Sequence, residues 1–261
     1  MCCAHQRGQG IDTVLSSSHR INVLKPIRIF RHDSWVGTGH FAETLKEKGL
    51  NYELVAIDQG DSVPDDVANI GGLAFLGGTM SVNDSFTWIR DELNLIRSAS
   101  QRKLPVFGHC FGAQLISKAL GGKISAMSSK EIGWHAVKFF DNDTCRQWFH
   151  HLPETIDVMF WHEDAMTIPS GGIPLYSSTH YPDQAFTIDN MIATIPHVEV
   201  TAVMLRKWLE IYSDDLAPLS ASVQSAEEIS RDHEQRISIM QQLTEILYNR
   251  WIDMVTAYSS L

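Results

Sequence analysis

Short apolar runs alternate with amphipathic segments along the first half of the chain. The runs are rich in Ile, Val, Leu and Phe, which is typical of strands buried on both faces of a sheet. They cover residues 27–30, 52–57, 73–76 and 104–107. Segments with the spacing of amphipathic helices lie between and after them, over 40–48, 85–99 and 113–120. This alternation predicts an α/β fold with a mainly parallel sheet that helices cover on both faces.

The pattern changes between residues 132 and 195. The β-type runs are shorter there and are separated by turn-rich pieces such as 169–172. They cover 134–140, 158–161 and 185–188. We expect these runs to form antiparallel strands added at one side of the parallel sheet. A helix over 201–212 follows, and Pro218 breaks the chain.

The last part of the chain has apolar residues at a spacing of three and four, which predicts an amphipathic helix over 226–258. Its apolar face has two interpretations. It packs back on the core, or it forms a surface for a homodimer or another partner. The whole pattern predicts a loose, polar N-terminal arm over 1–24, a main domain over 25–215 and a C-terminal helical extension over 216–261.

Composition narrows the function classes. Hydrophobic residues make up 44% of the 261 residues, which is ordinary for a globular protein. The 31 acidic and 21 basic side chains give a net charge of −10, which argues against a nucleic-acid partner. The chain has no apolar run long enough to span a membrane, and its first residues lack the apolar core of a signal peptide. We therefore expect a cytoplasmic protein.

The four cysteines are too sparse for a disulfide framework, and no Cys-x-x-Cys pair or histidine spacing suggests a metal site. We expect neither a metal nor a cofactor. One cysteine nevertheless has a setting for chemistry. Cys110 stands in Gly108-His109-Cys110-Phe111-Gly112, between a predicted strand and a predicted helix. This is the form of a nucleophile elbow, in which glycines permit a strained turn and the helix N-terminus favours the thiolate. The alternative is a buried structural cysteine.

These residues resemble the signature of the class I glutamine amidotransferases. Further segments resemble that family in the same order, and the similarity is to stand-alone members related to the amidotransferase part of GMP synthase. The similar segments are Gly77-Gly78-Thr79-Met80-Ser81-Val82, Glu131-Ile132-Gly133-Trp134, Trp161-His162-Glu163-Asp164, Asp183-Gln184-Ala185-Phe186 and His197-Val198-Glu199-Val200-Thr201. Together they extend roughly from residue 26 to 212.

The resemblance implies a flavodoxin-like fold and a Cys-His-Glu triad of Cys110, His197 and Glu199. It also implies that the N–H groups of Gly78 and Phe111 form the oxyanion hole. Gly77, Gly112, Gln114 and His162 are then expected to line the substrate site. Around the triad histidine the chain departs from the family pattern, since Ile195-Pro196 precede it and Val198 replaces a proline.

From the residues alone, two histidines compete for the role of base. His162 and His197 each have an acidic residue two positions later, Asp164 and Glu199, and residues two apart in a strand face the same side. The family resemblance favours His197. Under that interpretation His162 lines the pocket or packs beside Trp161.

The resemblance implies hydrolysis of the glutamine side-chain amide through a γ-glutamyl thioester, with ammonia as the other product. The chain has no Gly-x-x-x-x-Gly-Lys-Ser/Thr loop, so we expect any amination of an acceptor to occur on a separate synthetase subunit. Two alternatives stay open. The same triad could hydrolyse γ-glutamyl peptides or amides, or the protein could be a non-catalytic binding or regulatory module that kept the fold.

Overall fold

The computed structural model describes residues 25–260, so the arm predicted over 1–24 lies outside the described residues. Within them, nine strands form one sheet. The strands are β1 (Ile27–Arg31), β2 (Tyr52–Ala56), β3 (Gly72–Phe75), β4 (Val106–His109), β5 (Ile124–Phe139), β6 (Thr155–Met166), β7 (Ile173–Ser178), β8 (Ala185–Ile188) and β9 (Met191–Thr194). The helices are α1 (Gly39–Glu47), α2 (Thr87–Gln101), α3 (Phe111–Ala119), α4 (Asp143–Phe149), α5 (Ala202–Ile211), α6 (Ala226–Ser230) and α7 (His233–Ser259), with short 3-10 turns η1 (Ile57–Gln59) and η2 (Ser213–Leu216).

The sheet has the strand order β2-β1-β3-β4-β9-β8-β7-β5-β6. Strands β1 to β4 are parallel, and β8, β7, β5 and β6 extend the sheet with antiparallel pairs. The prediction of a mainly parallel sheet with antiparallel strands on one side is therefore confirmed. The prediction is corrected at strand β9, which pairs parallel with β4 and antiparallel with β8. It is the last strand of the parallel part, and the sequence pattern did not separate it from the antiparallel additions.

The antiparallel part is also larger than the apolar runs indicated. β5 and β6 are 16 and 12 residues long and pair over most of their length, with a register shift between Ala126 and Glu131. β7 was not predicted at all, because Pro174 and a serine-rich end interrupt its apolar pattern. The long β5–β6 pair matters for function because it positions His162 opposite Glu131.

Helices lie on both faces of the sheet, as predicted. Successive residues of β4 show this directly, since side chains alternate between the faces of a strand. Phe107 contacts Phe41 of α1 and Trp251 of α7. A Cβ placed on the next residue, Gly108, would instead lie 2.5 Å from the backbone of Gly112 in α3. The helices α1 and α7 therefore cover one face of β4 and α3 covers the other.

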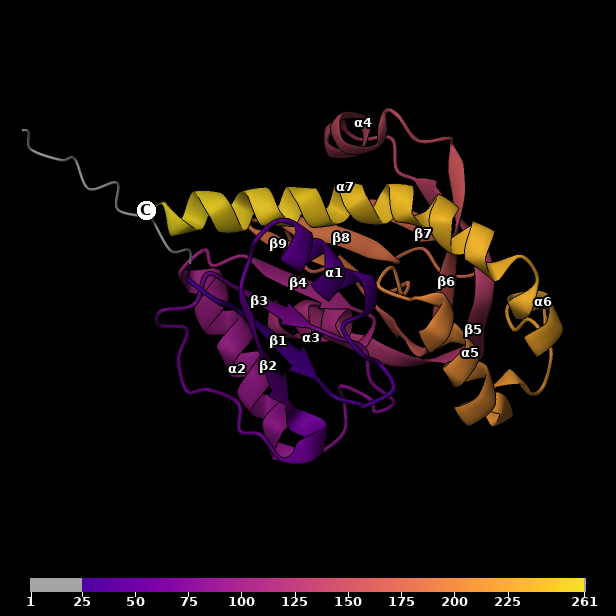
Figure 1. The fold of residues 1–261 in the computed structure, drawn as a ribbon, viewed down its shortest axis with the longest axis horizontal. Helices are drawn as coiled ribbons and strands as arrows, with labels where there is room; N and C mark the ends of the chain where they lie inside the picture. The colour runs from indigo at the N-terminus through magenta and orange to yellow at the C-terminus, as the bar shows by residue number, and fades with distance from the viewer. Residues whose placement is uncertain (1–24, 261) are drawn as a thin grey trace, which may run out of the picture.

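The C-terminal extension is two helices rather than the single one predicted over 226–258. Asp232 adopts the left-handed conformation (φ 52°) between α6 and α7, and no proline or glycine marks that break in the sequence. Figure 1 shows α7 as the long yellow helix along one side of the molecule. Most of its predicted apolar face is buried, namely Ile237, Met240, Leu243, Leu247 and Trp251, whereas Met254 is half-buried. Packing on the core is thus the interpretation that the structure supports, and this face is not available for a homodimer.

None of the helices within residues 25–260 combines the length and the apolar character that crossing a bilayer requires. Residues 25–260 also contain no group of three or more His, Cys, Asp or Glu side chains arranged to hold a metal ion.

Candidate active site

Cys110 lies in a strained turn between β4 and α3. Its backbone angles are φ 48° and ψ −107°, a combination that residues with a side chain rarely adopt. The glycines on either side permit the turn. A Cβ on Gly112 would collide with the carbonyl oxygen of Phe75 in β3, and one on Gly108 would collide with Gly112. The Cys110 N–H donates to the Thr194 carbonyl at 2.8 Å, which joins the turn to the end of β9. The predicted nucleophile elbow is present in geometry.

The Cys110 thiol lies at the floor of a pocket of about 440 Å³ and is only 5% exposed. Its Sγ is 3.8 Å from the carbonyl oxygen of Trp161. Cys110 directly precedes the first turn of α3, and the unpaired N–H groups of that turn carry partial positive charge. The thiol therefore lies at the positive end of the helix dipole.

His197 and Glu199 form a buried pair in the loop after β9. The Nδ1 atom of His197 is 2.7 Å from Oε1 of Glu199. The side chains are almost fully buried, and the His197 N–H donates to the carbonyl of Met159 in β6 at 2.8 Å. The carboxylate therefore fixes the ring orientation and leaves Nε2 for other partners.

The charges of this pair depend on each other. Burial would lower the pKa of His197, but the charge of Glu199 and the contact with Cys110 outweigh it and raise the pKa to about 10. Burial would likewise raise the pKa of Glu199, but above all the charge of His197 and its hydrogen bond hold it below its usual value. At neutral pH the ring is therefore an imidazolium, and it lies beside the Cys110 thiol.

His162, the competing histidine, has different partners. Its Nε2 lies 2.9 Å from Oε2 of Glu131, and its Nδ1 lies 3.1 Å from the backbone oxygen of Asp164. The carboxylate of Asp164 bonds Ser81 instead, at 2.5 Å. Both ring nitrogens of His162 are thus engaged within the β5–β6 region, so of the two His–carboxylate pairs that the sequence left open, the pair of His162 with Asp164 does not form. Only the His197 pair has its carboxylate two residues later.

The predicted glycine loop follows β3 and lies against the pair. A Cβ on Gly77 would be 2.8 Å from Cε1 of His197 and 3.6 Å from Cβ of Cys110. Gly78 follows and lines the pocket. On the other side, Phe111 is the first residue of α3, so its N–H has no acceptor within the helix.

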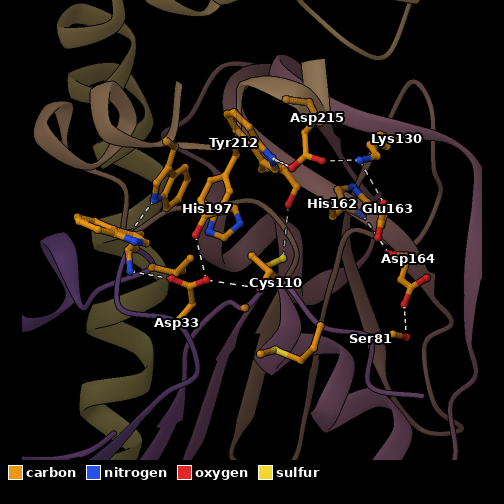
Figure 2. Close-up of a pocket in the computed structure, with 18 of the residues that line it drawn as sticks. Asp33, Ser81, Cys110, Lys130, His162, Glu163, Asp164, His197, Tyr212 and Asp215 are labelled. Carbon is orange, nitrogen blue, oxygen red and sulfur yellow. Dashed lines mark hydrogen bonds and ion pairs between the residues drawn. The ribbon is translucent and has the colours of Figure 1, made fainter. Parts of the chain in front are cut away.

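Figure 2 shows Cys110 in the middle of the pocket, with His197 on one side and His162, Glu163 and Asp164 on the other. Gln114 also lines it and donates to the Asp164 backbone oxygen at 3.0 Å. Five of the predicted residues thus line one pocket, and the others lie behind its wall. The lining ones are Gly78, Cys110, Gln114, His162 and His197, and those behind are Gly77, Phe111, Gly112 and Glu199.

Several pocket residues had no signal in the sequence. Lys130 bonds Asp215 at 2.5 Å and Glu163 at 3.3 Å, and these ionic contacts raise the pKa of Lys130 against a partial burial that would lower it. On the opposite wall, the Tyr212 hydroxyl donates to Asp33 at 3.0 Å. These pairs join segments far apart in the chain, so only the tertiary structure reveals them.

Comparison with known proteins agrees with this geometry. The sequence profile of the family Glutamine amidotransferase class-I matches residues 38–186. A crystal structure of a glutamine amido transferase from Methylobacillus flagellatus is similar with a TM-score of 0.85 and 33% identity, over 88% of this chain and 95% of that one. The glutamine amidotransferase-like protein YfeJ of Salmonella typhimurium is 24% identical over 231 residues, which are 86% of this chain and 95% of YfeJ.

The names of two further relatives indicate two different activities. The glutamine-hydrolysing GMP synthase of Petrotoga mobilis is 30% identical over 127 residues, which are 48% of this chain but 22% of that protein. This chain therefore spans about a fifth of the length of that relative. Gamma-glutamyl peptidase 3 of Arabidopsis thaliana is 25% identical over 173 residues, 63% of this chain and 69% of the peptidase.

The profile match covers more than half of the chain and includes the elbow, and the Methylobacillus structure is similar along nearly its whole length. This chain belongs to the class I glutamine amidotransferase family.

Proposed function

We propose that the protein hydrolyses the side-chain amide of glutamine with Cys110 as nucleophile. The observation that carries the proposal is the pairing in one pocket of a thiol in a nucleophile elbow with a buried imidazolium held by a carboxylate at 2.7 Å. Cysteine nucleophiles need this combination of a stabilised thiolate and an oriented acid.

In the first half-reaction, the Cys110 thiolate attacks the amide carbon of glutamine. The N–H groups of Gly78 and Phe111 bind the oxyanion of the tetrahedral intermediate, and one such donor contributes about 10²–10³ in rate. His197 gives its proton to the amide nitrogen. The carbon–nitrogen bond then breaks, ammonia leaves, and a γ-glutamyl thioester remains on Cys110.

In the second half-reaction, His197 is neutral and takes a proton from water, while the resulting hydroxide attacks the thioester carbon. The carbon–sulfur bond breaks and glutamate leaves. Cys110 is again a thiolate and His197 again an imidazolium, so each cycle consumes one water and releases one glutamate and one ammonia. We assign substrate contacts to Gln114 and His162 in the pocket wall. The resemblance to the family adds Gly77 and Gly112, which lie just behind that wall.

The proposed fate of the ammonia rests on the relatives. The GMP synthase that matches this chain over 22% of its length is named for glutamine hydrolysis within a larger protein. We therefore propose that a separate synthetase subunit uses the ammonia released here. Thiols stay reduced in the cytoplasm, and we propose the cytoplasm as the location of this cysteine nucleophile.

A second candidate is hydrolysis of γ-glutamyl peptides or amides with a larger leaving group. A pocket of about 440 Å³ falls in the range that holds drug-sized ligands. Its wall on the His197 side carries Trp208, whose ring lies 4.8 Å from that of His197, and Trp35, which is 47% exposed. Because His197 protonates the leaving group, a larger leaving group would lie on this side of the pocket, next to the two indoles. The similarity to gamma-glutamyl peptidase 3 also favours this candidate.

The first experiment measures glutamate release from glutamine by wild type, Cys110→Ala and Cys145→Ala. Cys145 is a matched control because it is also buried and free, yet it lies in α4 and burial raises the pKa of its thiol. We expect a loss of at least about 10³-fold for Cys110→Ala and none for Cys145→Ala. Equal rates for wild type and Cys110→Ala would overturn the proposal. Failure of 6-diazo-5-oxo-norleucine to label Cys110 would favour the non-catalytic module.

The two candidate substrates are separated by kcat/KM for glutamine and for γ-glutamyl dipeptides. Trp35→Ala sharpens the comparison because the side chain is exposed at the pocket wall and contributes little to the core. If the larger leaving group binds the indoles, the variant loses activity on dipeptides and keeps its activity on glutamine.

A further inference from the structure

Helix α7 contacts the residue just before the nucleophile. Since side chains alternate along β4, His109 faces α7 while Cys110 follows in the turn toward the pocket. The hydroxyl of Tyr248 in α7 lies 2.9 Å from Nε2 of His109. Both side chains are completely buried.

The protonation of this contact is defined by its surroundings. Burial lowers the pKa of His109 to about 4, so its ring is neutral at physiological pH. Burial also raises the pKa of Tyr248, so its hydroxyl keeps its proton. The bond therefore joins a neutral hydroxyl to a neutral imidazole, and the tautomer of the ring decides which group donates. Phe41 and Phe107 enclose the tyrosine ring, at 4.9 and 5.4 Å between ring centroids, and give the hydroxyl a fixed direction.

The same helix also contacts the segment that carries the other two triad residues. The hydroxyl of Thr244 lies 3.2 Å from the carbonyl oxygen of Val198, which stands between His197 and Glu199. It is equally far from the carbonyl of Met240, one turn earlier in α7. Thr244 and Val198 are fully buried, so water does not compete for this bond.

Thr244 and Tyr248 are four residues apart, so they lie on the same side of α7, about one helical turn from each other. One hydroxyl reaches the segment of Cys110 and the other reaches the segment of His197 and Glu199. The two segments are also joined by the parallel pairing of β4 with β9 and by the bond from the Cys110 N–H to Thr194, so α7 adds a second connection between them.

We infer that Tyr248 and Thr244 are positioning residues, which hold the nucleophile segment and the His197–Glu199 segment at the spacing that proton transfer needs. The inference rests on the proposed catalytic roles of Cys110 and His197. It assigns α7, which lies beyond the residues matched by the family profile, a function in catalysis as well as in the core.

The test uses two variants that remove one hydroxyl each, Tyr248→Phe and Thr244→Val. The same helix supplies matched controls. Thr256 also bonds the carbonyl one turn earlier, that of Ile252, but no triad segment, so Thr256→Val controls for Thr244→Val. Tyr258 lies near the end of α7, and Tyr258→Phe controls for Tyr248→Phe. Thr244→Ser keeps the hydroxyl and serves as the rescue variant.

Two readouts are needed. The first is kcat and KM for glutamate release, where we expect each test variant to lose about five- to tenfold in kcat at nearly constant KM. The second is the pH dependence of Cys110 alkylation by iodoacetamide, which reports the thiolate–imidazolium pair and needs no substrate. We expect both test variants to shift this profile, the controls to leave it unchanged, and Thr244→Ser to restore it.

If Tyr248→Phe and Thr244→Val behave like their controls in both readouts, the inference is wrong. If they lose stability without a shift of the alkylation profile, their role is only structural and the inference is again wrong. A shifted profile in a protein that hydrolyses no amide would contradict the proposed function but support the positioning of Cys110 and His197 by α7.

Discussion

Replacing Glu199 by glutamine tests the charge balance of the candidate site directly. The change keeps the size of a fully buried side chain and removes one negative charge. That charge is the largest of the influences that oppose burial and raise the pKa of His197 to about 10. Without it, only the contact with Cys110 opposes burial, and we expect the pKa of His197 to fall toward its ordinary value of 6.5.

The size of the effect follows from the pKa. A fall from about 10 to 6.5 corresponds to about 5 kcal/mol of lost stabilisation of the imidazolium, at about 1.4 kcal/mol per pKa unit. That value is an upper limit for catalysis, because the glutamine oxygen can still accept from Nδ1 of His197. A loss of about 5 kcal/mol would lower kcat by at most about 10³–10⁴-fold. We expect Glu199→Gln to lower kcat by at least about 10²-fold.

The assay follows glutamate release and the alkylation of Cys110 by iodoacetamide between about pH 6 and 10. In the wild type the imidazolium persists to about pH 10, so alkylation depends weakly on pH below that. In the variant we expect alkylation to rise with pH, as for an unassisted thiol. Glu92→Gln is the matched control, since Glu92 is equally buried and pairs with His32 at 3.1 Å outside the pocket lining. A Glu199→Gln protein with the wild-type kcat and alkylation profile would refute the coupling of the pair.

Three further predictions concern stability. The raised pKa of His197 stabilises the fold fully below pH 6.5, and this contribution is lost as the pH rises through about 10. The lowered pKa of Glu199 stabilises the fold above pH 4.5. The free energy of unfolding that the pair contributes, measured by denaturant titration, should therefore be largest between pH 4.5 and 6.5. Gly112→Ala should lower the melting temperature severely or prevent folding, because the new Cβ meets the backbone oxygen of Phe75; a wild-type Tm would contradict that contact. Lys103 follows the end of α2 in the left-handed conformation (φ 54°), which glycine adopts more easily. Lys103→Gly should therefore stabilise the fold by about 0.5–1 kcal/mol and raise Tm by about 1–4 °C in a calorimetric scan. An unchanged or lower Tm would contradict the expected relief of backbone strain.

The parts of the fold that could be predicted from the sequence depend on local patterns. Strands β1 to β4 and the elbow at Cys110 combine apolar runs with glycines at fixed offsets, and such local signals can be read without knowing which segments are neighbours. Strand β2 was found in this way although most of its side chains are exposed. Strand β9 carries an equally apolar run, yet a buried run does not reveal whether its partner is parallel or antiparallel. Its position in the sheet therefore had to come from the structure.

The candidate site divides in the same way. Cys110, His197 and Glu199 stand in segments with a recognisable order of residues, so sequence reasoning could propose them. The partner of His162 could not be predicted, because Glu131 faces it only through the register of β5 and β6. The contact of Tyr248 with His109 is similarly a product of helix packing, although the apolar spacing of α7 correctly indicated which face is buried.

The parallel pairing of β4 with β9 has a consequence for the order of folding. The bond from the Cys110 N–H to the Thr194 carbonyl closes over the whole antiparallel part of the sheet, which lies between these residues in the chain. Contacts so distant in sequence form slowly, since the entropy of closing the loop must be overcome before they contribute. The elbow can form locally, but His197 reaches the thiol only when β9 has joined β4. The reactivity that we propose for Cys110 would then appear late during refolding, so the rate of its modification would report when the sheet is complete.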